Sequence, residues 1–322
     1  MSNVWNGLNH DNIFSSVESV VEAPLSPLLR ERNSYINRVF EVECSDDQER
    51  LIAKFYRPRR WTREQILEEH HFLDELSGND LPVIAPVNFK GSTLFEAKGT
   101  ESTVFFCLFP KKGGRAVDEC DEDAWQNIGR HLARIHSIGE LHKKSKRATW
   151  KPSIATKHHI EVLLKSDLIP DKFRNSMEKA SKSFVNKAEP LFAEAPFILI
   201  HGDCHRSNLI SRPGEGIFLI DFDDMVMGPA VQDLWMLLPG EPDECENEMK
   251  WFLRGYETFR EFDTASLALV PALRGMRLIH FASWLAVQSK DPHFEKHFPQ
   301  ARTPKYWNEL IKEIQGLVYN TL

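Results

Sequence analysis

The stretch FILIHGDCHRSN at residues 197–208 decides the fold of this chain. Four apolar residues run directly into a polar loop that carries Asp203 and Asn208. A second stretch, IFLIDFDD at residues 217–224, repeats the pattern and places Asp221 directly after its apolar residues. Short apolar runs bounded by polar residues are typical of buried strands. We therefore expect two strands whose ends bring these three polar side chains to one cleft.

The spacing of these three residues suits phosphoryl transfer. Asn208 follows Asp203 by five residues, and Asp221 follows Asn208 by thirteen. One carboxylate can orient a hydroxyl and accept its proton, while the amide oxygen and the other carboxylate can hold Mg²⁺ on a triphosphate. Hard oxygen ligands of this kind favour Mg²⁺ over zinc.

The residues up to position 110 predict a mostly antiparallel sheet with one inserted helix. Alternating apolar and polar residues predict strands at 35–43 and 51–56, and further strands are expected at 81–90 and 102–109. Between them, Thr62 begins a capping box with a glutamine three residues later, which predicts the start of a helix. That helix is expected to end near residue 78, a glycine.

The pattern becomes helical after Pro110. Apolar residues recur at steps of three and four over 121–137, and residues 246–289 are expected to be largely helical. The sequence KKGG at 111–114 is the natural hinge. We therefore predict an α+β protein with two lobes and a cleft between them: a β-rich lobe at 1–110 and a mostly helical lobe at 111–322.

Composition excludes several classes of protein. The chain has 322 residues and a net charge of −7. Because nucleic acids and anionic membranes bind cationic surfaces, we expect neither to be a general partner of this chain. Its longest apolar run, at 104–109, is far shorter than the roughly 20 residues that span a bilayer. Five scattered cysteines and the lack of a secretory signal favour reduced thiols and a cytoplasmic location. We also expect a monomer.

Six blocks of sequence, in order along the chain, resemble one known group of enzymes. They cover most of the chain: NSYINRV (33–39), KFYRPRRWT (54–62), QILEEHHF (65–72), FPKKGGR (109–115), HGDCHRSN (201–208) and GPAVQDLWMLL (228–238). Together they resemble the aminoglycoside phosphotransferase and choline kinase superfamily, whose members are relatives of the eukaryotic protein kinases. More closely, they resemble the bacterial stress response kinase A family of serine/threonine protein kinases. The resemblance implies a protein-kinase-like fold with ATP bound between the lobes.

The resemblance also implies roles for residues of the second lobe. Asp203 would be the catalytic base. Asn208 and Asp221 would be the Mg²⁺ ligands, and Asp221 would occupy the place of the aspartate in the Asp-Phe-Gly motif of protein kinases. Cys204, next to the base, is interpreted as a buried, inert thiol rather than a redox-sensitive one. Asp233 is interpreted as structural, accepting hydrogen bonds from the amides of the catalytic loop.

Residues of the first lobe would bind the nucleotide. By the same resemblance, Lys54 would contact the α- and β-phosphates, and Glu69 would pair with Lys54, with the adjacent Glu68 as the alternative. Ser34 would contact ATP from the turn that replaces a glycine-rich loop. Phe109 belongs to the backbone segment 107–110 that would hold the adenine.

The sequence departs from protein kinases in three ways. No GxGxxG motif is present, and Asp223 stands where eukaryotic kinases have glycine. Only twelve residues separate Asp221 from Asp233. That distance leaves little room for a long activation loop that could be phosphorylated.

Three functions are compatible with these residues. The leading hypothesis is an ATP- and Mg²⁺-dependent serine/threonine protein kinase of the stress-response type, which also phosphorylates itself. The alternative is a small-molecule kinase that acts on the hydroxyl of an amino alcohol or aminoglycoside, because the same residues would serve either acceptor. A nucleotide-binding scaffold without activity is disfavoured, because the lysine, both aspartates and the asparagine are all present.

Overall fold

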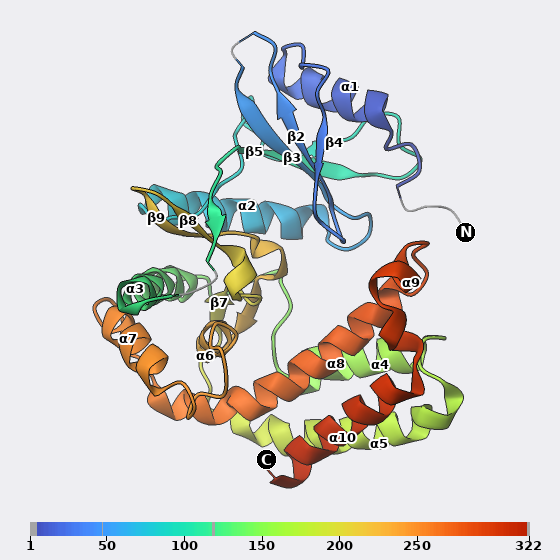
Figure 1. The fold of residues 1–322 in the computed structure, drawn as a ribbon, viewed down its shortest axis with the longest axis vertical. Coiled ribbons are helices and arrows are strands. Elements are labelled where there is room, and N and C mark those ends of the chain that lie inside the picture. Colours follow the sequence, from blue (N-terminus) through green and yellow to red (C-terminus); the bar gives the residue numbers. More distant parts are fainter. Residues whose placement is uncertain (1–4, 47, 118–119, 321–322) are drawn as a thin grey trace.

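The computed structural model describes residues 5–46, 48–117 and 120–320. Figure 1 shows a twisted sheet with a helix on either side of it, above a larger, mostly helical part. The strands are β1 (Arg30–Arg32), β2 (Arg38–Glu43), β3 (Arg50–Phe55), β4 (Phe95–Glu96), β5 (Phe105–Pro110), β6 (Arg115–Ala116), β7 (Ile198–Ile200), β8 (Leu209–Arg212), β9 (Gly216–Leu219) and β10 (Val226–Gly228). The α-helices are α1 (His10–Val21), α2 (Arg63–Gly78), α3 (Glu122–Gly139), α4 (Lys157–Leu164), α5 (Asp171–Ala188), α6 (Val231–Trp235), α7 (Glu246–Tyr256), α8 (Val270–Gln288), α9 (Phe294–His297) and α10 (Pro304–Asn320).

The N-terminal sheet is antiparallel, with strand order β1-β2-β3-β5-β4. Successive side chains of a strand point to opposite faces, and β3 shows the consequence. Ala53 and Phe55 are buried in the core that the sheet shares with α1. Ile52 and Lys54 point to the other face, where both line a cavity. The alternation in the sequence therefore positions a lysine on the cleft side of the sheet.

Helix α2 lies between the sheet and the helical part (Figure 1). The predicted capping box is confirmed: Thr62 Oγ1 accepts a hydrogen bond from the backbone N–H of Gln65 at 3.3 Å, and Gln65 Oε1 accepts one from the N–H of Thr62 at 3.0 Å. The buried face of the helix carries one acidic residue, Glu69, among mostly apolar neighbours. The cap fixes where the helix begins and hence which side chains face the cleft.

Two expectations for the N-terminal part were wrong. Helix α1 was not predicted, although Asn9 caps it and Ile13 and Val17, four residues apart, are buried against the sheet. The expected strand at 81–90 is an irregular segment with isolated bridges at Val83 and Phe89. Prolines at 82 and 86 explain the difference, because proline has no N–H to donate to a neighbouring strand.

The C-terminal part places two short β-structures next to a set of helices. Strand β7 pairs with β10, while β8 and β9 form a hairpin that also pairs with β6. The predicted helix over 121–137 is α3, with Trp125, Ile128, Leu132 and Ile135 buried as the spacing requires. A short π-helix occurs at Pro152–Thr156. Short 3₁₀-helices occur at Glu189–Phe192, Arg206–Asn208, Phe222–Asp224, Thr264–Leu269 and Pro299–Arg302. The loops that follow β7 and β9 are thereby brought beneath the N-terminal sheet.

Candidate active site

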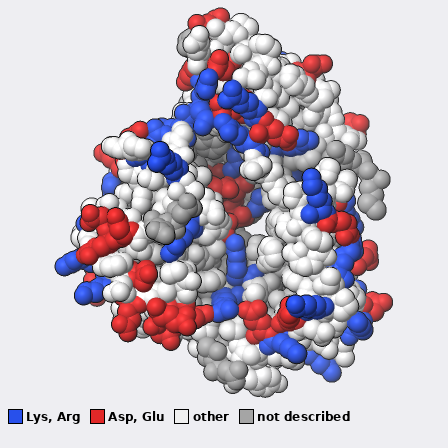
Figure 2. Space-filling view, viewed as in Figure 1, with Lys and Arg blue, Asp and Glu red and all other residues white. Residues whose placement is uncertain are grey.

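A cavity of about 470 Å³ lies between the sheet and the loops that follow the C-terminal strands. Ser34, Lys54, Glu69, Phe109 and Asp221, five of the residues selected from the sequence, all line it. Figure 2 shows a hollow in the middle of one face of the molecule, with Asp and Glu side chains inside it and Lys and Arg side chains above it. The cavity is walled by both apolar and charged side chains, as a nucleotide requires.

Lys54 is the centre of a buried charge cluster. Its Nζ forms an ion pair with Asp223, lies 3.4 Å from Asp221 Oδ1 and lies 3.8 Å from Glu69 Oε1. Burial alone would lower the pKa of Lys54, but the carboxylates, Asp223 first, raise it well above its usual value. The lysine is therefore ionised, with its charge directed at the cavity.

The structure distinguishes the two candidate partners of this lysine. Glu69 is 1% exposed and faces Lys54. Glu68 instead accepts a hydrogen bond from the backbone N–H of Lys146 at 2.8 Å. The geometry therefore brings Glu69, and not Glu68, to the lysine.

Arg147 holds Glu69 from the other side and was missed by the sequence analysis. Its Nη2 lies 3.1 Å from Glu69 Oε2, and the same guanidinium donates to the carbonyl oxygens of Asp223 at 2.6 Å and Gln65 at 2.8 Å. Its guanidinium carbon also lies 4.5 Å from the centre of the Trp61 ring. Arg147 belongs to a run of mostly basic residues at 143–151, and it is almost fully buried.

Asp223 joins the two parts of the molecule. Besides Lys54, its carboxylate accepts a hydrogen bond from Asn37 Nδ2 at 2.6 Å and lies 3.5 Å from Arg60 Nη1. Burial opposes its ionisation, but Lys54 and Arg60 lower its pKa well below the usual range. The residue that replaces the glycine of protein kinases thus anchors the lysine and the turn at residues 33–37.

A second carboxylate, Asp233, fixes the loop that follows β7. It accepts hydrogen bonds from the backbone N–H groups of His201 at 2.9 Å and Gly202 at 2.8 Å, and it contacts His136 Nε2 at 3.1 Å. Gly202 has φ of +81°, and a Cβ there would lie 2.4 Å from the carbonyl oxygen of Asp224. The loop can therefore approach the next loop only with glycine at this position.

Asp203 projects from this loop. Its Oδ1 lies 2.5 Å from Arg277 Nη2, and its Oδ2 lies 3.5 Å from His205 Nε2. Although burial opposes ionisation, the hydrogen bond from His205 and the charge of Arg277 lower the pKa of Asp203 to about 2. A carboxylate with so low a pKa orients a hydroxyl well but is a weak base, so it receives the proton late in a transfer reaction.

Asn208 and Asp221 offer the donor set that a divalent cation of the Mg²⁺ type prefers. Asn208 Nδ2 donates to the carbonyl oxygen of Asp203 at 2.9 Å. This hydrogen bond fixes the orientation of the side-chain amide, so its oxygen, Oδ1, points away from that carbonyl group. The Asp221 side chain is 52% exposed and lines the cavity. Within the described ranges no three His, Cys, Asp or Glu side chains form a metal cluster. A cation here would need oxygen atoms of the bound phosphates as well, which fits a metal that arrives with a nucleotide.

Cys204 follows Asp203 in the same loop, and its side chain is fully buried. Burial, together with the nearby carboxylates of Asp233 and Asp203, raises the pKa of its thiol well above the usual value. The thiol is therefore protonated and unreactive at neutral pH. This agrees with its interpretation as an inert core residue.

A sheet with an ionised lysine, a helix with its glutamate, and two aspartate loops around one cleft define a phosphotransferase of the kinase-like class. Comparison with known protein families also identifies a phosphotransferase. The phosphotransferase enzyme family matches residues 29–270, and the chain therefore belongs to that family and is an ATP-dependent phosphotransferase.

Curated relatives share more than a third of their aligned residues with this chain. Stress response kinase A of Escherichia coli (strain K12) is 37% identical over 292 residues, which cover 89% of this chain and 84% of that protein. Serine/threonine protein kinase RdoA of Salmonella typhimurium (strain LT2) is 35% identical over 293 residues, covering 89% of this chain and 85% of that protein.

Solved structures share the fold at lower sequence identity. Amicoumacin kinase hAmiN, solved with AMP-PNP, Ca²⁺ and its ligand, superposes with a TM-score of 0.74 at 19% identity and covers 97% of both chains. A microcompartment-associated aminopropanol kinase superposes with a TM-score of 0.67 at 18% identity, covering 94% of both. These matches confirm the predicted α+β, kinase-like architecture. No helix among the described residues is both long and apolar enough to cross a membrane.

Proposed function

We propose that this chain is a serine/threonine protein kinase of the stress-response type, which uses ATP and Mg²⁺ and also phosphorylates itself. The observation that carries the proposal is the similarity, over 89% of the chain, to relatives named as stress response and serine/threonine protein kinases. The two kinases with solved structures described above, which are named for small molecules, are under 20% identical to it. The proposal includes action as a monomer in the cytoplasm.

In this proposal, Lys54 binds the α- and β-phosphates and Glu69 holds the lysine in place. Ser34 contacts the nucleotide from the 33–37 turn, and the β5 segment that contains Phe109 borders the adenine. The position of each residue around the same cavity supports these assignments. The buried carboxylates around the lysine keep it ionised and rigid, so little reorganisation is needed when ATP binds.

The remaining residues act on the transferred group. Asp203 orients the acceptor hydroxyl and takes its proton, while Arg277 keeps the carboxylate ionised. Asn208 and Asp221 would hold Mg²⁺, which, when bound, neutralises charge on the phosphate oxygens. Asp221 is also proposed as a catalytic residue, because it lines both the nucleotide cavity and the cavity that contains Asp203.

The test is transfer of radiolabelled phosphate from ATP. Purified protein should label itself or a generic protein acceptor on Ser or Thr. The Asp203→Ala variant should lose this labelling by about 10²–10⁴-fold, because it lacks the general base, and should still bind ATP. A matched control is Asp171→Ala, at the start of α5, where the side chain is 99% exposed. Labelling that requires choline, homoserine or an aminoglycoside, and never reaches protein, would replace this proposal with the small-molecule alternative.

A further inference from the structure

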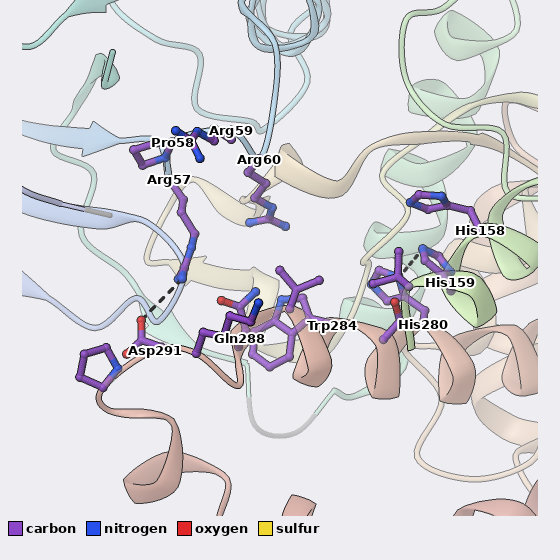
Figure 3. A pocket seen from close by; sticks show the side chains of 15 residues that line it. Arg57, Pro58, Arg59, Arg60, His158, His159, His280, Trp284, Gln288 and Asp291 are labelled. Carbon is purple, nitrogen blue, oxygen red and sulfur yellow. Dashed lines mark hydrogen bonds and ion pairs between the residues drawn. The ribbon is translucent and has the colours of Figure 1, made fainter. Parts of the chain in front are cut away.

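A second cavity opens beside the catalytic loop. It has a volume of about 690 Å³ and lies between the 57–60 segment after β3, helix α4 and helix α8 (Figure 3). A smaller cavity of about 330 Å³ contains Asp203 and Asp221. Arg60, His280 and Trp284 line both cavities, so the two lie side by side. We call the larger cavity the outer groove; it borders the cavity in which an acceptor would meet Asp203.

The outer groove is lined by more positive than negative side chains. Four cations and one described carboxylate, Asp291, border it. Arg60 is neutralised by Asp224, whose two carboxylate oxygens each accept a hydrogen bond from Arg60 Nη2 at 2.7 Å, and Arg57 lies 3.6 Å from Asp291. Arg59 and Lys290 are exposed, and within the described residues neither has an ion-pair partner. The groove therefore carries two positive charges that are available to a ligand.

One buried donor in the groove also lacks a partner. Arg57 Nη1 is inaccessible to solvent and has no hydrogen-bond partner among the described residues. A buried, charged donor without a partner is costly, and a carboxylate or phosphate oxygen is the acceptor that matches a guanidinium best. Figure 3 shows the Arg57 side chain extending from the segment after β3 towards Asp291, across from helix α8.

Two histidines of the groove, His159 and His280, add no charge. His159 Nε2 and His280 Nδ1 lie 3.1 Å apart, and one of them must donate to the other. Burial lowers the pKa of His159 to about 3 and that of His280 to about 4. Both rings are neutral at pH 7, so neither adds to the positive charge that the arginine and lysine side chains give the groove.

The carboxylates nearest the reaction centre are already paired. Asp203 contacts Arg277, and Asp223 contacts Lys54. Asp224 is held by Arg60. An acceptor with an ammonium group, such as choline or an aminoglycoside, would therefore find unpaired cations in the groove and paired carboxylates beyond it. This charge pattern disfavours a cationic acceptor and favours an anionic one.

Helix α8 also presents an apolar surface at the groove. Trp284 lines it, and the Phe281 ring stacks on Trp284 with ring centres 5.7 Å apart. Phe281 and Val287 are 41% and 56% exposed. A polypeptide segment can cover this surface while its acidic side chains meet Arg59 and Lys290, whereas a small acceptor would leave most of the groove empty.

We infer that the outer groove selects protein segments in which the phosphorylated Ser or Thr is flanked by Asp or Glu. The inference rests on the proposed protein kinase function and adds to it a substrate class. Electrostatic complementarity of this kind acts on the rate of association and on the choice of partner.

The test compares three peptides that share one Ser or Thr and differ only in flanking Glu, Ala or Lys residues. Wild type should phosphorylate the Glu peptide with the highest kcat/KM, and the preference should shrink at high salt because exposed charges are screened. Arg59→Glu and Lys290→Glu should each lower kcat/KM for the Glu peptide by about tenfold and raise it for the Lys peptide, since a charge about 6 Å away is then repelled instead of attracted. Lys182→Glu, on α5 and away from the groove, is the matched control, and Tm shows that each variant is folded.

The outcomes separate the inference from the function it rests on. Equal kcat/KM for the three peptides, or a preference for the Lys peptide, overturns the inference and leaves the protein kinase proposal standing. Phosphorylation of amino alcohols or small hydroxy acids, with no labelling of any peptide or protein, overturns both. A preference for the Glu peptide that Arg59→Glu and Lys290→Glu reverse supports both.

Discussion

Replacing Arg147 with methionine should destabilise the fold more than a typical surface substitution, because the arginine is the buried counterion of Glu69. Its guanidinium makes three short contacts, to Glu69 Oε2 and to the carbonyl oxygens of Asp223 and Gln65. Methionine fills much of the same space but donates no hydrogen bond. Glu69 would then keep only Lys54 as a positive partner, at 3.8 Å.

The size of the effect follows from the burial of both partners. The side chains of Arg147 and Glu69 are 0% and 1% exposed. Removing one partner of a buried ion pair costs about 3–5 kcal/mol, because the other charge stays behind without compensation. That is a large fraction of the roughly 5–15 kcal/mol by which a protein of this kind is stable. The pKa of Glu69, already raised by burial although Lys54 and Arg147 oppose it, should rise further.

Urea unfolding of four proteins measures this directly: wild type, Arg147→Met, Glu69→Gln and the double variant. The double variant should be less destabilised than the sum of the singles, since a neutral glutamine side chain no longer needs a counterion, and the coupling should exceed about 1 kcal/mol. Lys144→Met, an exposed position in the same basic cluster, is the control and should change stability by less than about 0.5 kcal/mol. If Arg147→Met costs no more than this control, or the two sites prove additive, the role given to Arg147 is wrong.

Four further outcomes are expected. Lys54→Met should stay folded, because Arg60 and Arg147 still face the carboxylates, yet lose most of its rate; an unchanged rate in the folded variant would contradict the assignment. Asp221→Asn should raise the Mg²⁺ concentration needed for half-maximal turnover, whereas activity that is insensitive to EDTA would contradict the metal site. Because the pKa of Asp203 is about 2 in the folded state and about 4 when unfolded, stability should fall by up to about 2 kcal/mol as the pH drops from about 4 to about 2, and Arg277→Met should reduce this fall in acid-unfolding curves. Cys204 should resist iodoacetamide until the protein unfolds, as mass spectrometry of the labelled peptides would show.

Local patterns in the sequence were sufficient for the parts of the site that depend on neighbouring residues. The two apolar runs that lead to Asp203 and Asp221 form strands β7 and β9, and Thr62 caps the helix that carries Glu69. The contacts that complete the site join residues far apart in the chain, such as Arg147 with Glu69 and Asp223 with Asn37. No local pattern predicts pairs of this kind.

Nothing in the neighbouring residues distinguishes a buried arginine from a solvated one. Arg147 is surrounded by lysines that are exposed, and its own burial depends on the packing of α2 against the loop after β9. Helix α1 is a different case, because its sequence carried a helix signal that was overlooked: Ile13, Phe14, Val17, Val20 and Val21 recur at helical spacing and pack against the sheet. The sequence predicts which residues carry charge, and only the tertiary packing decides which charges meet.

The hydrogen bonds that Arg147 makes with α2 oppose one way in which this enzyme could be inactivated. In a hinge-like inactivation, the helix that carries the glutamate would rotate outward and separate Glu69 from Lys54. Here the same arginine holds the first turn of α2 through Gln65, the middle of the helix through Glu69 and the loop after β9 through Asp223. An outward rotation would have to break these contacts and leave two buried charges without partners. The resting chain is thus held in an assembled arrangement, in which Glu69 already faces Lys54 and no helix movement is needed to bring them together.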